Sequence, residues 1–208
     1  MTMDSRRSSI FGLLLVLASP GAFGQKFGIV PATLYWQETS EWCWAASGKT
    51  MMNLVGPSDV PQCYEANQHF GRTDCCNCPT PDACVSPGWP DFDTWGYKFQ
   101  ETTWGTALSW TQLKGEISAQ RPVWYAWGWN GGGGHAMVAK GYFDIDILFI
   151  HDHLVLIDNP WPPQGRCGAG NASGPFGGAF EWISYDDWVG GSGYDHVHWQ
   201  DIYQVAHK

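Results

Sequence analysis

Apolar positions recur at helical spacing in the chain up to about residue 120, and three helices are expected there. Their bounds are residues 41–55, 60–70 and roughly 109–120. Ser40 can cap the first helix through its side-chain oxygen, and Gly71 can end the second because glycine tolerates the left-handed conformation found after many helices.

From residue 123 onward apolar and polar positions alternate, which is the period of a β-strand. The segments that alternate or carry runs of apolar residues are 123–129, 135–143, 147–160, 180–183 and 196–205. Before the last of these, Ser184 followed three residues later by Asp187 can open a short helical turn. Since the helices come first and the strands second, the pattern indicates an α+β fold with an antiparallel sheet.

Length and composition are those of a single globular domain. The chain has 208 residues, of which 14 are Trp and 26 are Gly, and its formal net charge is −9. We expect one domain at residues 25–208, with a helical, cysteine-rich part at about 25–107 and a β part at about 108–208. No cluster of Lys and Arg follows Arg6 and Arg7, which argues against a nucleic-acid-binding protein.

The first 24 residues have the pattern of an export signal. Arg6 and Arg7 supply positive charge, residues 10–18 are apolar, and small residues precede a predicted cleavage between Gly24 and Gln25. A buried core helix is the alternative, and the apolar stretch is too short to span a bilayer comfortably. The pattern predicts a secreted or periplasmic protein with no membrane span.

The seven cysteines suit an oxidising compartment, where six can form three disulfides and one is left over. Five of the seven lie between residues 63 and 84, in a segment with so little apolar pattern that it needs covalent links to be ordered. Zinc is the alternative, but the spacing is not a standard one and no His lies between Cys75 and Cys84, so no metal is expected. The disulfide candidates, whose pairing the spacing leaves open, are Cys63, Cys75, Cys76, Cys78, Cys84 and Cys167.

Cys43 lies in the first turn of the first predicted helix, about 20 residues from the cysteine cluster. The unpaired N–H groups and the positive end of the helix dipole favour a thiolate at such a position. We therefore expect the pKa of Cys43 to be lowered and the residue to be a nucleophile. The alternative is an inert or disulfide-bonded cysteine.

A nucleophilic cysteine needs a base, and His135 is the candidate among the seven His residues. It follows four glycines, which allow a substrate or a partner backbone to approach closely, and it begins a strand that would face a cleft. The alternative is an ordinary loop histidine. Asn159 or Asp158 can accept a hydrogen bond from the imidazole, and Gln37 can donate to an oxyanion beside the Cys43 N–H.

Three blocks of sequence resemble the papain-like cysteine peptidases and occur in the order typical of that family. They are Gln37 with Cys43 and Trp44, the segment GGHAMVAKGY, and the segment VLIDNPWPPQG. The chain looks most like the short bacterial branch of the family, which includes effector peptidases with a WCWAA-type active-site helix. The resemblance covers nearly all of residues 33–205.

The resemblance implies a helical lobe that carries the nucleophile, an antiparallel β lobe that carries the base, and a cleft between them. Cys43 would be the nucleophile, His135 the base and acid, and Gln37 the oxyanion donor. Asn159 would orient the imidazole, with Asp158 as the alternative.

The cleft is expected to be aromatic, with Trp161 shielding the His–Asn hydrogen bond from water. The other cleft candidates, which favour apolar substrate side chains near the cut, are Trp42, Trp44, Trp127 and Trp129. The chain departs from the family at Glu41 and Trp42, which replace the glycines usual beside the nucleophile, so substrate entry is expected to differ.

These observations predict a secreted thiol peptidase that cleaves peptides or proteins as a monomer and needs no cofactor. One alternative keeps the Cys–His site but uses it as an amidase or acyltransferase. The other is a disulfide-stapled binding protein with a carbohydrate or protein ligand and a vestigial site.

Overall fold

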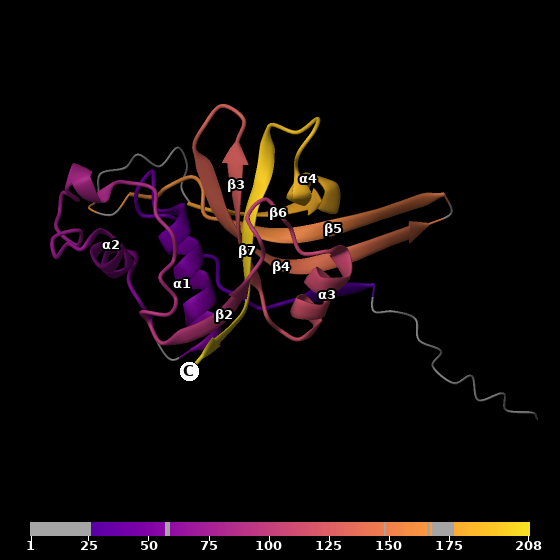
Figure 1. The fold of residues 1–208 in the computed structure, drawn as a ribbon, viewed down its shortest axis with the longest axis horizontal. Helices are drawn as coiled ribbons and strands as arrows, with labels where there is room; N and C mark the ends of the chain where they lie inside the picture. Colours follow the sequence, from indigo (N-terminus) through magenta and orange to yellow (C-terminus); the bar gives the residue numbers. More distant parts are fainter. Residues whose placement is uncertain (1–25, 57–58, 148, 166, 168–176) are drawn as a thin grey trace, which may run out of the picture.

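The computed structural model describes residues 26–56, 59–147, 149–165, 167 and 177–208. Its fold is mixed α+β, with one antiparallel sheet of seven strands and helices packed against both faces of that sheet (Figure 1). The predicted export signal lies outside the described residues. Within them, none of the helices is both long and apolar enough to cross a membrane.

The sheet contains more strands than the sequence pattern predicts. Its order is β2-β7-β3-β4-β5-β6, and β1 pairs with β4. The strands are β1 (Phe27–Ile29), β2 (Tyr97–Glu101), β3 (Val123–Trp129), β4 (Gly134–Ile147), β5 (Ile150–Asn159), β6 (Ala179–Ser184) and β7 (His196–His207). The pattern misses β1, which has three residues, and β2, in which alternation covers only five residues of an aromatic-rich segment. The sheet therefore draws strands from both sides of the predicted boundary near residue 108.

The helices form where the sequence predicts them, although each of the three longer ones starts one or two residues later. They are α1 (Cys43–Val55), α2 (Gln62–Phe70), α3 (Trp110–Ser118) and α4 (Tyr185–Val189), and a 3-10 turn η1 (Asp82–Cys84) lies between α2 and β2. The ends of α2 and α4 follow the prediction. Gly71 ends α2 with a φ of 62°, and Ser184 caps α4 by accepting the Asp187 N–H at 3.0 Å.

The predicted cap of α1 is wrong. Trp42 occupies the N-cap position and makes no side-chain capping bond. The Gln37 amide donates to the carbonyl oxygens of Thr39 and Ser40, both at 2.8 Å, in the turn that precedes the helix. Because this turn places Ser40 two residues before the N-cap, its hydroxyl is in the wrong position to cap the helix.

Both faces of the sheet are buried, and β3 shows how the sequence achieves this. Trp124 and Ala126 belong to the core shared with α1 and α2, whereas Val123, Tyr125 and Trp127 belong to the core shared with α3 and α4. The alternation in VWYAWGW therefore sorts side chains between two hydrophobic cores and not between a core and solvent.

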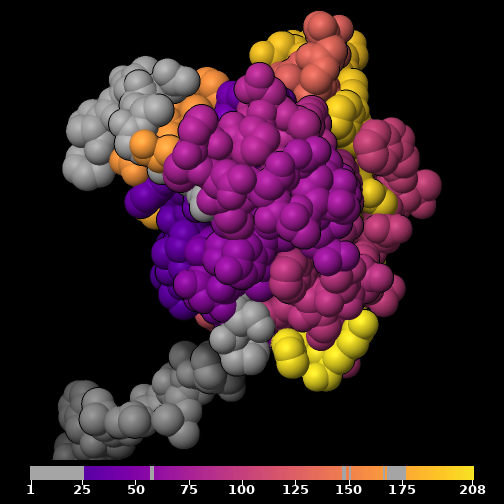
Figure 2. All heavy atoms as spheres, turned by 90° about the vertical axis from the view of Figure 1, so that its left-hand side faces the viewer, coloured from indigo at the N-terminus to yellow at the C-terminus, as the bar shows by residue number. Residues whose placement is uncertain are grey.

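Three disulfides organise the segment that lacks apolar pattern. They join Cys63 to Cys76, Cys75 to Cys84 and Cys78 to Cys167, and they leave Cys43 as the free cysteine. The predicted count of six paired cysteines and one unpaired cysteine is therefore confirmed. Figure 2 shows that the purple and magenta part of the chain, which contains α2 and most of these cysteines, covers most of the face in view.

β4 and β5 form a long hairpin that extends well beyond the other strands (Figure 1). Its turn is exposed to solvent, and Phe149 there is 96% exposed. The base of the hairpin lies close to α1, which packs against β4.

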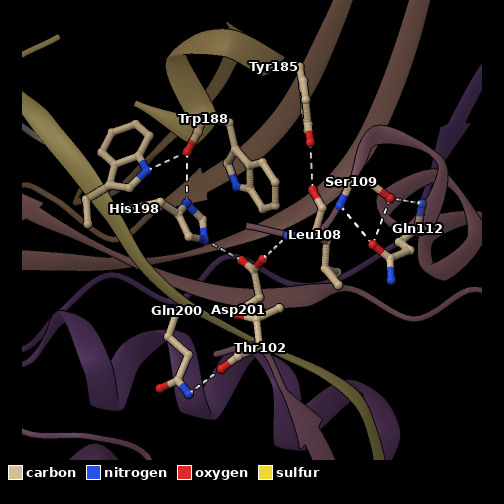
Figure 3. Close-up of polar contacts among 10 residues, drawn as sticks. Thr102, Leu108, Ser109, Gln112, Tyr185, Trp188, His198, Gln200 and Asp201 are labelled. Atoms are coloured by element: carbon tan, nitrogen blue, oxygen red, sulfur yellow. Dashed lines mark hydrogen bonds and ion pairs between the residues drawn. The ribbon is translucent and has the colours of Figure 1, made fainter. Parts of the chain in front are cut away.

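A buried polar network fastens β7 to the elements around it (Figure 3). Asp201 is fully buried, accepts the Leu108 N–H at 2.6 Å and lies 2.8 Å from His198 Nε2. His198 Nδ1 lies 3.0 Å from the Trp188 carbonyl oxygen, which also accepts the Trp127 indole N–H at 2.9 Å. The network joins β7, α4, β3 and the loop before α3, and it fixes Trp127 in the wall of a cavity.

Candidate active site

That cavity has a volume of about 820 Å³ and opens where the start of α1 meets the sheet. Its walls come from α1, from the loop at residues 87–89 and from strands β3 to β7. The predicted site residues that line it are Cys43, Trp44, Trp127, Trp129, His135, Asn159 and Trp161. The proposed nucleophile, base and orienting residue thus reach one cavity from three different elements.

The backbone of Ala136 is clamped by α1 on both sides. Its N–H donates to Cys43 Sγ at 3.4 Å, and its carbonyl oxygen accepts the Ser47 hydroxyl at 3.0 Å. Cys43 and Ser47 are four residues apart, so they lie on the same face of the helix. Because His135 directly precedes Ala136, this clamp fixes the start of β4, and with it His135, beside the sulfur.

His135 and Asn159 are hydrogen-bonded, with His135 Nε2 lying 2.8 Å from Asn159 Oδ1. The Asn159 amide has two further partners: Nδ2 donates to Glu181 Oε1 at 2.8 Å, and Oδ1 accepts the Trp161 backbone N–H at 3.0 Å. A carboxylate oxygen only accepts and a backbone N–H only donates, so these partners identify which amide atom is oxygen.

This identification fixes the tautomer of the histidine. Since Asn159 Oδ1 is an acceptor, the hydrogen of the neutral imidazole lies on His135 Nε2. The lone pair is then on Nδ1, which is the nitrogen free to accept a proton from a thiol. The amide of Asn159 thus holds the imidazole in one tautomer, with Nδ1 left as the acceptor.

Asp158 takes no part in this arrangement. It lies on the opposite side of β5 from Asn159 by strand alternation, and it forms a buried ion pair with Lys140 at 2.6 Å. Burial raises the pKa of Asp158 to about 6, against the opposing influence of Lys140. Of the two orienting residues that the sequence leaves open, Asn159 contacts His135.

Gln37 is buried and already engaged. Both N–H groups of its amide donate to the carbonyl oxygens of the turn before α1, and Gln37 is not among the residues that line the cavity in the described chain. Donation to an oxyanion would require this amide to leave at least one of those carbonyls. Its role as an oxyanion donor remains a prediction.

Trp42 does not lie in the cleft, which corrects the expectation for this residue. It is fully buried, and its indole N–H donates to the Cys84 carbonyl oxygen at 2.7 Å. Neighbouring residues at the start of a helix point in directions about 100° apart, so Trp42 faces the disulfide-bonded segment while Cys43 faces the cavity.

Burial of the sulfur raises the pKa of the Cys43 thiol to about 11, so the expectation of a lowered pKa is wrong. The N–H groups of Ala136 and Trp44 act in the opposite direction but are outweighed by burial. The nearby Glu41 carboxylate contributes to the rise. The N–H groups near the helix start therefore lower the pKa of Cys43 by less than burial raises it.

Burial also lowers the pKa of His135, against the opposing influences of the Asn159 hydrogen bond and the Glu181 charge. Both shifts favour the neutral forms of the thiol and the imidazole, which line the same cavity.

Glu181 is a site residue that the sequence analysis missed. It lies on β6, where Phe180 is 62% exposed and Trp182 is 46% exposed, so that the carboxylate faces inward while the aromatic rings face solvent. A charged residue at the inward position of an alternating strand is unusual. In the segment FEWI the charged residue and the aromatic residues occupy opposite positions to those expected, and this pattern could have pointed to Glu181.

The glycines before His135 serve the structure around the cavity. Gly132 and Gly133 have φ values of 94° and 82°, which few other residues adopt. A Cβ at Gly134 would collide with the Trp199 ring, which packs across the start of β4. The sequence predicts that a substrate or a partner backbone approaches these glycines closely. In the structure the group that does so at Gly134 is the indole of Trp199 on β7.

The geometry defines an α+β protein in which a free cysteine at a helix start shares a cavity with a histidine that is hydrogen-bonded to an asparagine. Comparison with models of known protein families finds no match for this chain, and a search of curated proteins also finds none. The chemistry of the site is therefore inferred from its own residues.

Proposed function

We propose that the chain is a papain-like cysteine peptidase that hydrolyses peptide bonds through a thioester on Cys43. One observation carries the proposal: the Ala136 N–H bonds to Cys43 Sγ at 3.4 Å while the adjacent His135 bonds to Asn159 at 2.8 Å, within one cavity. The order of these residues agrees with the sequence resemblance. In this proposal α1 and the disulfide-bonded segment form one lobe and the sheet forms the other.

The first half of the reaction forms the thioester. His135 Nδ1 accepts the thiol proton as Cys43 Sγ attacks the carbonyl carbon, so that charge develops only when substrate is present. The resulting imidazolium is stabilised through Asn159 and by the charge of Glu181. It then protonates the leaving amine, and the C–N bond breaks.

The second half restores the enzyme. A water molecule gives a proton to His135 and attacks the thioester carbonyl, and the C–S bond breaks as Cys43 recovers its proton. In both halves the oxyanion lies near the first turn of α1, where backbone N–H groups have no helical partner. Gln37 would add a second donor after reorienting.

The test combines covalent labelling with cleavage of a peptide library. We expect iodoacetamide and an epoxysuccinyl inhibitor to modify only Cys43 in the folded protein, and cleavage to disappear in Cys43→Ala and fall at least about 100-fold in His135→Ala. Library products are identified by mass spectrometry, with and without added amines.

Each outcome separates one function from another. Transfer of the acyl group to added amines without hydrolysis would identify an acyltransferase. Full biological effect of the Cys43→Ala protein would identify a binding protein with a vestigial site. The three disulfides are compatible with action outside the cytosol in every case.

A further inference from the structure

Two of the described residues that line the cavity carry a carboxylate, and only one of these has a partner in the described part of the chain. Glu181 accepts a hydrogen bond from Asn159 at 2.8 Å. Glu41 makes no hydrogen bond or ion pair with any residue that the structure describes. No Lys or Arg is among the described residues that line the cavity, so neither carboxylate faces a cation of the protein itself.

Glu41 lies close to the reacting atom. It is two residues before Cys43, so the two Cα atoms are at most about 7 Å apart. Its negative charge acts on the sulfur strongly enough to contribute to the raised pKa of Cys43. Both residues line the same cavity, so a substrate residue held at the sulfur occupies a space that Glu41 also lines.

A negative charge at this position is unfavourable for the free enzyme. It opposes formation of the thiolate on Cys43, and much of the cavity wall around it is indole. The lining tryptophans are Trp44, Trp89, Trp127, Trp129, Trp161 and Trp199. Indole faces attract cations, and the net charge of −9 attracts cations to the whole molecule. All three features favour a positively charged group in the cavity.

We propose that Glu41 selects substrates with Lys or Arg at the residue whose carbonyl is attacked. The ammonium or guanidinium group pairs with the Glu41 carboxylate while its aliphatic part packs on the indole walls. The bound cation also neutralises the charge that opposes thiolate formation, so the correct substrate assists the activation of Cys43. This inference rests on the proposed peptidase function.

The cleavage test uses peptides that are identical except at that residue, which is Arg, Lys, citrulline or Glu. Citrulline keeps the shape of Arg without its charge. We expect kcat/KM to be about tenfold or more higher for Arg and Lys than for citrulline, and lowest for Glu. In Glu41→Gln the ratio of kcat/KM for the Arg peptide to kcat/KM for the citrulline peptide should fall to nearly one. The control is Glu101→Gln, which removes an exposed carboxylate of β2 and should leave the preference unchanged.

A binding test keeps this inference separate from the peptidase proposal. Affinities of the same peptides are measured by calorimetry with Cys43→Ala and with the double variant Cys43→Ala, Glu41→Gln. Tighter binding of Arg than of citrulline, lost in the double variant, supports the role of Glu41 even if the wild-type protein cleaves no peptide. Equal affinity for Arg and citrulline peptides would overturn it even if cleavage is observed.

Discussion

Glu181 acts on His135 in two ways, through the orientation of Asn159 and through its negative charge. Glu181 accepts from Asn159 Nδ2, which turns Asn159 Oδ1 toward His135. Its charge also raises the pKa of His135, whereas burial lowers that pKa. Glu181 is therefore a positioning residue with an electrostatic effect on His135, the proposed base.

The variant Glu181→Gln tests this electrostatic effect. The amide oxygen of Gln can still accept from Asn159, but the charge is lost, so the pKa of His135 should fall further and the base should weaken. We expect kcat to fall about tenfold and the acidic limb of the pH–rate profile to move to lower pH. Glu181→Ala should cost more, because it also frees the Asn159 amide. An unchanged acidic limb in Glu181→Gln would leave Glu181 with a structural role only.

The protonation state of Cys43 is open to a direct test. Because burial raises its pKa to about 11, alkylation by iodoacetamide should be slow at neutral pH and should rise about tenfold per pH unit above it. The rate is followed by mass spectrometry, with His135→Ala as the control that should behave alike. A rate that stays flat from acid to neutral pH would instead show that a thiolate–imidazolium pair exists in the free protein.

At the scale of elements, the site depends on how β4 and β7 are attached to their neighbours. The Ala136 clamp fixes β4 to α1, and the Asp201 network fixes β7 to α4 and to the loop before α3. Both nitrogens of His198 face oxygen atoms, one of Asp201 and one of the Trp188 carbonyl. The Asp201–His198 pair is therefore buried with an oxygen partner at each nitrogen of the imidazole.

Asp201→Asn should destabilise the protein without changing the chemistry of the cavity. The variant loses one partner of a buried pair, for which about 3 kcal/mol is the expected cost in free energy of unfolding. Urea unfolding followed by Trp fluorescence measures that cost, and the alkylation rate of Cys43 checks the site. The double variant with His198→Gln should cost less than the sum of the single variants. Additive costs would contradict a coupled pair.

The secondary-structure elements also explain which site residues could be predicted from the sequence and which could not. The residues themselves point to Cys43 and His135, because each lies at the start of an element with a clear period. They leave Asn159 and Asp158 open, and only the family resemblance favours Asn159. The pKa of Cys43 could not be predicted, since it depends on burial beneath the start of β4 and not on the helix start alone. Glu181 could not be placed, because its contact with Asn159 requires the pairing of β5 with β6.

At the scale of the whole molecule, covalent links compensate for a segment that has little apolar pattern. Two disulfides close short loops within that segment, and Cys78–Cys167 closes a loop with a sequence separation of 89. That six cysteines pair and one stays unpaired was predictable from the sequence. Their pairing was not, because spacing alone does not tell which cysteines approach each other in the fold.

The longest loop should contribute most to stability. In the chain-entropy description, removing Cys78–Cys167 with paired Ala substitutions should cost about 2 kcal/mol more than removing Cys75–Cys84, whose separation is 9. The free energy of unfolding is measured in urea without reductant. An equal or smaller cost for Cys78–Cys167 would show that loop length does not dominate, and that the buried positions of Cys75 and Cys84 do.

The Cys78–Cys167 disulfide has a further consequence for the exposed hairpin turn at Phe149. The turn lies within the covalent loop, with His135 on one side of it and Asn159 on the other. A single proteolytic cut there would leave two fragments that are still one molecule, with Cys43, His135 and Asn159 all retained. Such a nicked protein should migrate as one species on a non-reducing gel and separate into two only after reduction.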